Sequence, residues 1–236
     1  MISKRLSARF TSLLGTPPAR AVYGRSILPQ PVCSPNDLGL RTRSALLLPR
    51  DQLKTAYWDL ETWDLSPQFG PILAASVYDA ITKKMATFRI DNYVRSKQAV
   101  DMTDDRQLCI DLRNCLEKYH MTVGWFSKGF DLTHLRSRLV MHKERPLQEH
   151  LHLDCIWYFK GWRGLKPMSS KMKHVADFFG IEKKPDVSPE VWMKAKGGNR
   201  KAMDEVCNRC EADVRITHIL TEKALELGLV KNISRY

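Results

Sequence analysis

The sequence predicts an α/β fold built around one mixed β-sheet. Two observations support this fold class. Short apolar segments suited to strands come first along the chain, and they then alternate with segments whose apolar residues recur at helical spacing. The chain has 236 residues, enough to bury one substantial core. No apolar run approaches the roughly 20 residues that a membrane-spanning helix needs, which argues against a membrane protein.

The expected elements follow one another from Lys54 onward. Apolar runs predict strands over residues 55–60, 72–78, 83–90 and 121–125, and a strand or the start of a connector over 155–159. Helical spacing predicts helices over residues 103–120, from about Asp131, over 169–179 after a pair of serines, over 188–195, and one or two over 199–228. Ser188-Pro189 is a preferred helix start, and Gly228 is a typical helix end.

The first 52 residues differ in composition from residues 53–236, which we take as one domain. Residues 1–50 contain eight Lys or Arg and one acid, so they carry +7 of the net charge of +12. Several prolines interrupt any long element there. This extension is consistent with an organelle transit peptide that begins with an amphipathic helix over residues 1–14, with a basic tail that contacts nucleic acid, or with a small helical appendage.

Charge and cysteine content bear on partners and location. The remaining 186 residues carry only +5, so composition gives weak support for a polyanionic partner. Six cysteines in a chain of this length do not suggest a disulfide scaffold and favour a reducing compartment. We therefore expect a cytoplasmic protein, or a mitochondrial one if residues 1–50 are a transit peptide.

The most informative local pattern is Trp58-Asp59-Leu60-Glu61-Thr62. Side chains alternate across a strand, so Asp59 and Glu61 share one face. Two close carboxylates repel each other, and a divalent cation removes that penalty. Hard oxygen ligands suit Mg²⁺ or Mn²⁺. A strand end with solvated acids is the simpler alternative.

Two further acids lie at the edges of predicted helices. Asp131 follows a loop that begins at Gly124, and it could serve only as a favourable helix start. Asp213 lies beside a predicted apolar helix face formed by Ala212, Ile216, Ile219, Leu220 and Leu227. An acid at such an edge needs a partner to offset its desolvation, either a metal ion or a neighbouring Arg.

These motifs, in this order, resemble the DEDD exonucleases of the RNase H-like superfamily. That group includes the DnaQ-like proofreading nucleases and the exonuclease domains of family B polymerases. The resemblance covers roughly residues 53–230 and is greatest to stand-alone predicted RNase H-like nucleases of phages, archaea and bacteria. It therefore implies the cytoplasm of a bacterial or phage-infected cell. The stretches 59–75, 152–154 and 169–180 also fit. The resemblance implies a central mixed five-stranded sheet flanked by helices.

The resemblance also implies a site and an activity. Asp59, Glu61, Asp131 and Asp213 match the four family carboxylates, which hold two Mg²⁺ or Mn²⁺ ions. The implied activity is hydrolysis of single-stranded DNA or RNA from 3′ ends, as a 3′–5′ exonuclease. In the family pattern, Asp59 bridges both ions, Glu61 and Asp213 lie on the side of the attacking water, and Asp131 lies on the leaving-group side. Residues expected to contact the substrate are Thr62, Phe126, Lys128, Phe130 and Arg209.

Two departures from the family pattern affect this expectation. The family usually has a Tyr four residues, or a His five residues, before the last Asp, and this chain has Arg209 and Asn208 there. Arginine stays protonated and cannot act as a base, although it can stabilise a phosphate. Phe126 replaces a common Asn and could stack on a base or fill the core. A non-cutting nucleic-acid-binding module and a structure-specific endonuclease therefore remain alternatives.

Other candidate sites carry simpler interpretations as well. Cys207 and Cys210 form a C-x-x-C pair without a second pair at zinc-site spacing. Asp154 is either a supporting residue of the site or a structural one, and His218 is expected to be exposed. Residues 157–173 interleave basic and aromatic side chains, which suits either a bound single strand or a packed connector with a solvated basic face.

Overall fold

The computed structural model describes residues 52–93, 101–160, 165–182, 185–230 and 234–235. Residues 1–51, which make up nearly all of the predicted transit-like extension, lie outside these ranges. The strands are β1 (Thr55–Thr62), β2 (Ile72–Asp79), β3 (Met85–Arg89), β4 (Met121–Gly124), β5 (Leu151–Asp154) and β6 (Ser234–Arg235). The helices are α2 (Arg106–Leu116), α3 (Asp131–Met141), α4 (Met172–Phe178), α5 (Pro189–Lys196) and α6 (Arg200–Glu226), with short 3-10 turns at η2 (Ile90–Asn92) and η3 (Cys155–Tyr158).

The strands form one mixed sheet in the order β3-β2-β1-β4-β5-β6. Strand β1 pairs antiparallel with β2 and parallel with β4, and β4 pairs parallel with β5. Parallel neighbours require crossover connections, which α2 and α3 supply here. The four strands expected between residues 55 and 125 and the mixed α/β class are confirmed. Strand β5 is the fifth strand, and the two-residue β6 extends its edge.

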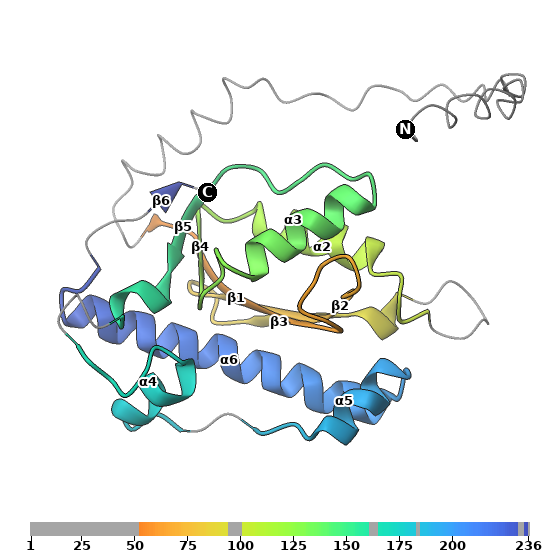
Figure 1. Cartoon of the computed structure of the whole chain (residues 1–236). Helices are drawn as coiled ribbons and strands as arrows, with labels where there is room; N and C mark the ends of the chain where they lie inside the picture. Colours follow the sequence, from red (N-terminus) through yellow and green to blue (C-terminus); the bar gives the residue numbers. More distant parts are fainter. Residues whose placement is uncertain (1–51, 94–100, 161–164, 183–184, 231–233, 236) are drawn as a thin grey trace, which may run out of the picture. The chain divides into compact units, whose positions relative to one another are not determined.

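Helices cover both faces of the sheet (Figure 1). Helices α2 and α3 lie on one face, and α6, with α4 and α5, lies on the other. Trp58 and Leu60 of β1 belong to the core cluster that contains the buried leucines of α2 and α3. Tyr57 belongs to a second cluster, together with the C-terminal half of α6. Alternation along β1 therefore directs Asp59 and Glu61 toward the α6 side.

The parallel strands bring their carboxyl ends to one edge of the sheet. Strand β1 continues past its pairing with β4, so Asp59 and Glu61 lie near the loop that leaves β4. Strand β5 ends beside β4 at Asp154. Such an edge is where open α/β sheets commonly gather functional groups.

Two expectations about individual elements were wrong, and one open alternative is decided. Residues 155–158 form a 3-10 turn, so they start a connector, and the fifth strand is β5. Helix α4 begins after Lys171 without a serine cap, because the Ser169 hydroxyl bonds to His174 instead. On α6, Ile219 and Leu227 are exposed, and the buried face runs through Val206, Cys210, Val214, Thr217, Thr221 and Ala224.

The remaining helix predictions agree with the structure. The Ser188 hydroxyl caps α5 by accepting the backbone N–H of Val191, and Asn199 caps α6 by accepting that of Ala202. Residues 200–226 form one continuous helix. Within the described ranges, the helices lack the combination of length and hydrophobicity that crossing a bilayer requires.

Candidate metal centre

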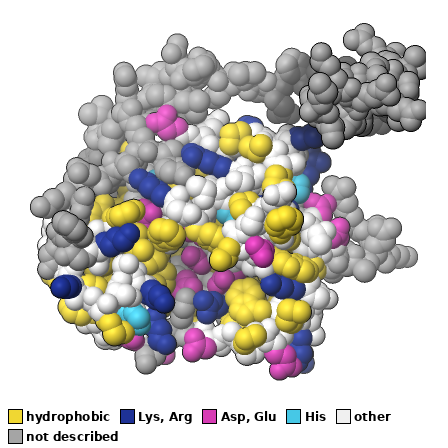
Figure 2. Space-filling model, viewed as in Figure 1, with side chains coloured by type: hydrophobic (Ala, Val, Ile, Leu, Met, Phe, Trp, Pro, Cys, Tyr) yellow, Lys and Arg dark blue, Asp and Glu magenta, His cyan; other side chains and the backbone are white. Residues whose placement is uncertain are grey.

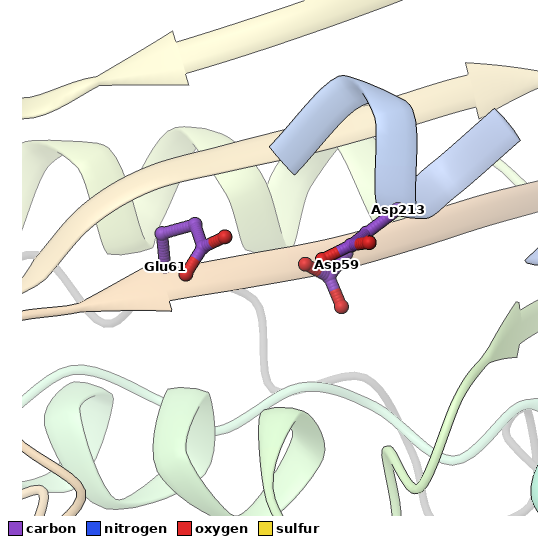
Figure 3. A group of neighbouring side chains, drawn as sticks. All are labelled: Asp59, Glu61 and Asp213. Atoms are coloured by element: carbon purple, nitrogen blue, oxygen red, sulfur yellow. The ribbon is translucent and has the colours of Figure 1, made fainter. Parts of the chain in front are cut away.

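Three carboxylates meet where α6 crosses β1 (Figure 3). Asp59 and Glu61 extend from β1, and Asp213 reaches them from α6. One ligand oxygen from each residue lies within 4.8 Å of the other two. Asp213 is buried, and Asp59 and Glu61 are half-buried. We call these three residues the acidic cluster.

The packing of α6 explains how Asp213 comes to lie beside Asp59, which is 154 positions earlier in the sequence. Small and apolar side chains of α6 pack closely along β1 and β2. Cys210 lies one turn before Asp213, with its sulfur 3.4 Å from the carbonyl oxygen of Asp59. Burial, together with the nearby Asp59 and Glu61 carboxylates, raises the pKa of the Cys210 thiol well above its usual range. Cys210 therefore stays a neutral packing residue and does not act as a nucleophile.

Arg209 contacts the acidic cluster directly. Its Nε donates to Oε1 of Glu61 at 3.0 Å, with side-chain exposures of 23% for Arg209 and 14% for Glu61. Arg209 and Asp213 are four residues apart on α6 and share its β1-facing side. The arginine that replaces the family's usual Tyr is thus an ion-pair partner of one of the cluster acids.

Asp131 lies next to the acidic cluster but outside its 4.8 Å group. Its Oδ1 accepts the backbone N–H of Leu60, between Asp59 and Glu61 on β1, at 3.1 Å. Burial, assisted by the charges of Asp154 and Glu61, raises the pKa of the Asp131 carboxyl to about 7, although hydrogen bonds from the backbone lower it. All four family-matched acids therefore lie in one region, although only three share the tight grouping.

The loop between β4 and α3 holds Asp131 in place. A Cβ on Gly124 would lie 2.5 Å from the Ser127 Oγ, so this close approach requires glycine. Phe126 adopts a left-handed backbone conformation with φ of 58°. The carboxylate of Asp154 accepts the backbone N–H of Lys128 at 3.1 Å. Asp154 therefore supports the loop, and its buried Oδ1 has no hydrogen-bond partner among the described residues.

A buried chain of hydrogen bonds continues from this loop into the sheet. The Ser127 hydroxyl bonds to Nε2 of His152 at 2.8 Å, and Nδ1 of His152 bonds to the Thr122 hydroxyl at 2.8 Å. The same hydroxyl bonds to Nε2 of His150 at 2.7 Å. Burial, followed by the charges of His150 and Lys128, lowers the pKa of His152 well below its usual range. Both imidazoles are therefore neutral links in a structural network.

The predicted substrate-contacting side chains occupy different surroundings. Phe126 is 46% exposed, and its ring covers Gly129. Phe130 is partly buried, and its ring lies 5.2 Å from that of His134. The Thr62 hydroxyl donates to the carbonyl oxygen of Asp64, and this hydrogen bond stabilises the turn after β1. Their contacts with a substrate stay predictions.

The other sequence candidates carry structural roles in the described part of the chain. Cys207 and Cys210 are buried free cysteines, and no third nitrogen or sulfur ligand joins them in a metal-type group there. His218 is half-buried and packs between Tyr57 and Tyr78, contrary to the expectation that it is exposed. Tyr158 and Phe159 are core residues, which favours a packed connector for the described part of residues 157–173. Trp162 and Arg163 of that segment lie outside the described residues.

The charge and donor chemistry of the acidic cluster fit a hard divalent cation. Three carboxyl groups gather in a partly buried position, and Arg209 pairs with one of them, Glu61. All three groups offer oxygen, the donor that Mg²⁺ and Mn²⁺ prefer, and the cluster contains no thiolate or imidazole. Figure 2 shows acidic side chains gathered in a hollow of this face, with hydrophobic and basic side chains around it.

Comparison with known proteins places the chain in a family. Residues 56–225 match the family model described as the RNase H superfamily. No curated protein matches. Among solved structures, the family B DNA polymerase of the hyperthermophilic archaeon Pyrobaculum calidifontis is similar, with a TM-score of 0.59 and 18% sequence identity. The similarity covers 75% of this chain and 25% of the polymerase chain, so this chain matches about a quarter of that protein's length. The fold and the family model agree, and the chain belongs to the RNase H superfamily.

Proposed function

We propose that this chain is a metal-dependent nuclease that hydrolyses phosphodiester bonds from the 3′ end of single-stranded nucleic acid. The observation that carries the proposal is the acidic cluster, whose three ligand oxygens lie within 4.8 Å of one another on a fold of the RNase H superfamily. The similarity to part of a DNA polymerase supports nucleic acid as the partner. The mildly basic body of the chain is compatible with that partner.

The proposed roles follow from the chemistry of phosphodiester hydrolysis. Asp59, Glu61 and Asp213 would hold divalent metal ions, and Asp131 would complete the set beside Asp59. Two bound ions would activate the attacking water and offset the charge on the entering and leaving oxygens. Asp131 must lose its proton to act as a ligand, and its pKa near 7 makes that loss part of metal binding.

Other side chains would position the strand. The guanidinium of Arg209 and the ammonium group of Lys128 would neutralise phosphate charge. The exposed ring of Phe126 would stack on a base, an interaction that tolerates any base. Phe130, just before α3, and Thr62, at the end of β1, would also contact the bound nucleic acid. No side chain among these can accept a proton in place of the missing Tyr or His.

A second candidate function is binding of nucleic acid without cleavage. The ion pair between Arg209 and Glu61 favours binding without cleavage. Arg209 occupies the position of the usual Tyr, and it engages Glu61, which is one of the expected metal ligands. Retention of all four family-matched acids favours cleavage. Internal cutting at flaps or junctions is a third possibility on the same fold.

Incubation of labelled nucleic acid with Mn²⁺ separates these functions. The substrates are end-labelled linear single strands and circular single strands, each as DNA and as RNA. A 3′–5′ exonuclease releases nucleotides from the linear strands and leaves the circles intact. Cutting of the circles would replace the exonuclease proposal by an endonuclease. Binding without any product from the four substrates would support the non-cutting module.

A further inference from the structure

The contact between Arg209 and Glu61 places a fixed positive charge at the proposed metal site. The two side chains meet at 3.0 Å, and neither is fully exposed to water. Solvent therefore screens their interaction less than that of a surface pair. Glu61 also contributes one of the three oxygens of the acidic cluster, which makes it common to the ion pair and to the proposed metal centre.

We propose that Arg209 and a divalent metal ion compete for Glu61, so that metal binding opens the ion pair and releases Arg209 toward a phosphate of the bound strand. This inference rests on the proposed function. A guanidinium and a divalent ion that share one carboxylate repel each other, and the repulsion is strong away from bulk water. Whatever free energy Arg209 gains from Glu61 must then be given up when the metal binds.

The position of Arg209 on α6 would allow it to bind a phosphate once the metal has released it from Glu61. Arg209 lies one helical turn from Asp213, so a released guanidinium stays beside the acidic cluster. Its planar donors match phosphate oxygens. A phosphate that captures Arg209 stops it from returning to Glu61 and so favours the metal-bound state. Metal and phosphate should therefore bind cooperatively, and the coupling must be reciprocal.

Calorimetric titration of MnCl₂ into the full chain tests the competition. The variant Arg209→Gln removes the competing charge and should bind Mn²⁺ about ten-fold more tightly than the wild type, within the usual range of coupling between sites. The matched control is Arg215→Gln on the same helix. Arg215 pairs with Glu211 at 2.8 Å, and its side chain is 57% exposed, so this control makes the same charge change away from Glu61. It should bind Mn²⁺ as the wild type does.

A second titration includes thymidine 5′-monophosphate, which carries a phosphate and has no phosphodiester bond to cleave. The nucleotide should strengthen Mn²⁺ binding to the wild type more than to Arg209→Gln. Equal or weaker Mn²⁺ binding by Arg209→Gln would overturn the competition and leave the metal site standing. If neither the wild type nor Arg209→Gln binds Mn²⁺ saturably, both the proposed metal site and this inference are wrong.

Discussion

Asp131 gives a quantitative test of the electrostatics around the proposed metal centre. Its carboxyl is buried, and its pKa rises from 3.8 to about 7 in the folded chain. A carboxyl whose folded pKa is raised stabilises the fold only while it is protonated. That contribution is complete below pH 3.8 and is lost as the pH rises through 7. The ionised carboxylate therefore destabilises the metal-free protein at alkaline pH.

The substitution Asp131→Asn removes this penalty with little change in shape. An amide oxygen can still accept the backbone N–H of Leu60. Each pH unit by which a pKa is displaced is worth about 1.4 kcal/mol, so the full penalty is roughly 4 kcal/mol. Relaxation of neighbouring groups and water reduces such penalties, and we expect a gain of about 2 kcal/mol at pH 8.5. That gain corresponds to a rise in Tm of about 4–8 °C for a chain of this length.

Urea unfolding of the metal-free chain, in the presence of a chelator, measures this gain. The stabilisation by Asp131→Asn should be roughly twice as large at pH 8.5 as at pH 5.5, because the wild-type carboxyl is mostly protonated at the lower pH. The control Asp177→Asn changes an exposed acid of α4 and should leave the stability almost unchanged. A loss of stability in Asp131→Asn at pH 8.5 would refute the reasoning, since it would mean that the ionised carboxylate stabilises the fold.

Three further predictions concern the framework of the site. Asp105 is fully buried and accepts hydrogen bonds from Arg138. Asp105→Ala should therefore lower the free energy of unfolding in urea by about 3–5 kcal/mol. A decrease below about 1 kcal/mol would contradict a structural role. Gly124→Ala should lower the free energy of unfolding by about 1–3 kcal/mol, because the added Cβ meets a Ser127 side chain that is fixed by a hydrogen bond. An unchanged Tm would show that the loop can shift freely. The pKa of His152 is lowered in the fold, so its contribution to stability is present above pH 6.5 and is lost as the pH falls further. In the Asp131→Asn background, unfolding measured between pH 7.5 and 5.5 should show falling stability, and His152→Gln should reduce that slope.

Local patterns in the sequence predict much of the fold. The alternation in β1 places Trp58 and Leu60 in the core and Asp59 and Glu61 on the opposite face. Ser188-Pro189 marks the start of α5, because capping depends on neighbouring residues alone. Such features need no knowledge of distant contacts, which is why these predictions agree with the structure.

Local sequence patterns do not predict features that depend on contacts between distant residues. Strand β5 carries His152 and Asp154, polar residues that argue against a central strand. Both are accommodated by partners from other segments, Thr122, Ser127 and the backbone of Lys128. The apolar run at residues 155–159 gives a stronger local strand signal, yet its side chains fill the core from a 3-10 turn.

The candidate site likewise has one part that the sequence predicts and another that depends on distant contacts. The order of motifs identifies the four acids, and the structure brings three of them within 4.8 Å. The pairing of Arg209 with Glu61 spans 148 positions and depends on how α6 lies along β1, so spacing alone cannot predict it. The roles of these residues in catalysis stay predictions until metal binding and cleavage are measured.

The most direct test of the central claim is the change in Tm that Mn²⁺ causes in the wild type and in Asp59→Ala. A ligand that binds only the folded chain stabilises it by about 2.7 kcal/mol at 100 times its Kd. Mn²⁺ should therefore raise the wild-type Tm by about 5–10 °C and leave that of Asp59→Ala unchanged. The charge-matched control Asp177→Ala changes an exposed residue of α4 and should respond as the wild type does. An equal rise in Asp59→Ala, or no rise in the wild type, would contradict a metal centre at the acidic cluster.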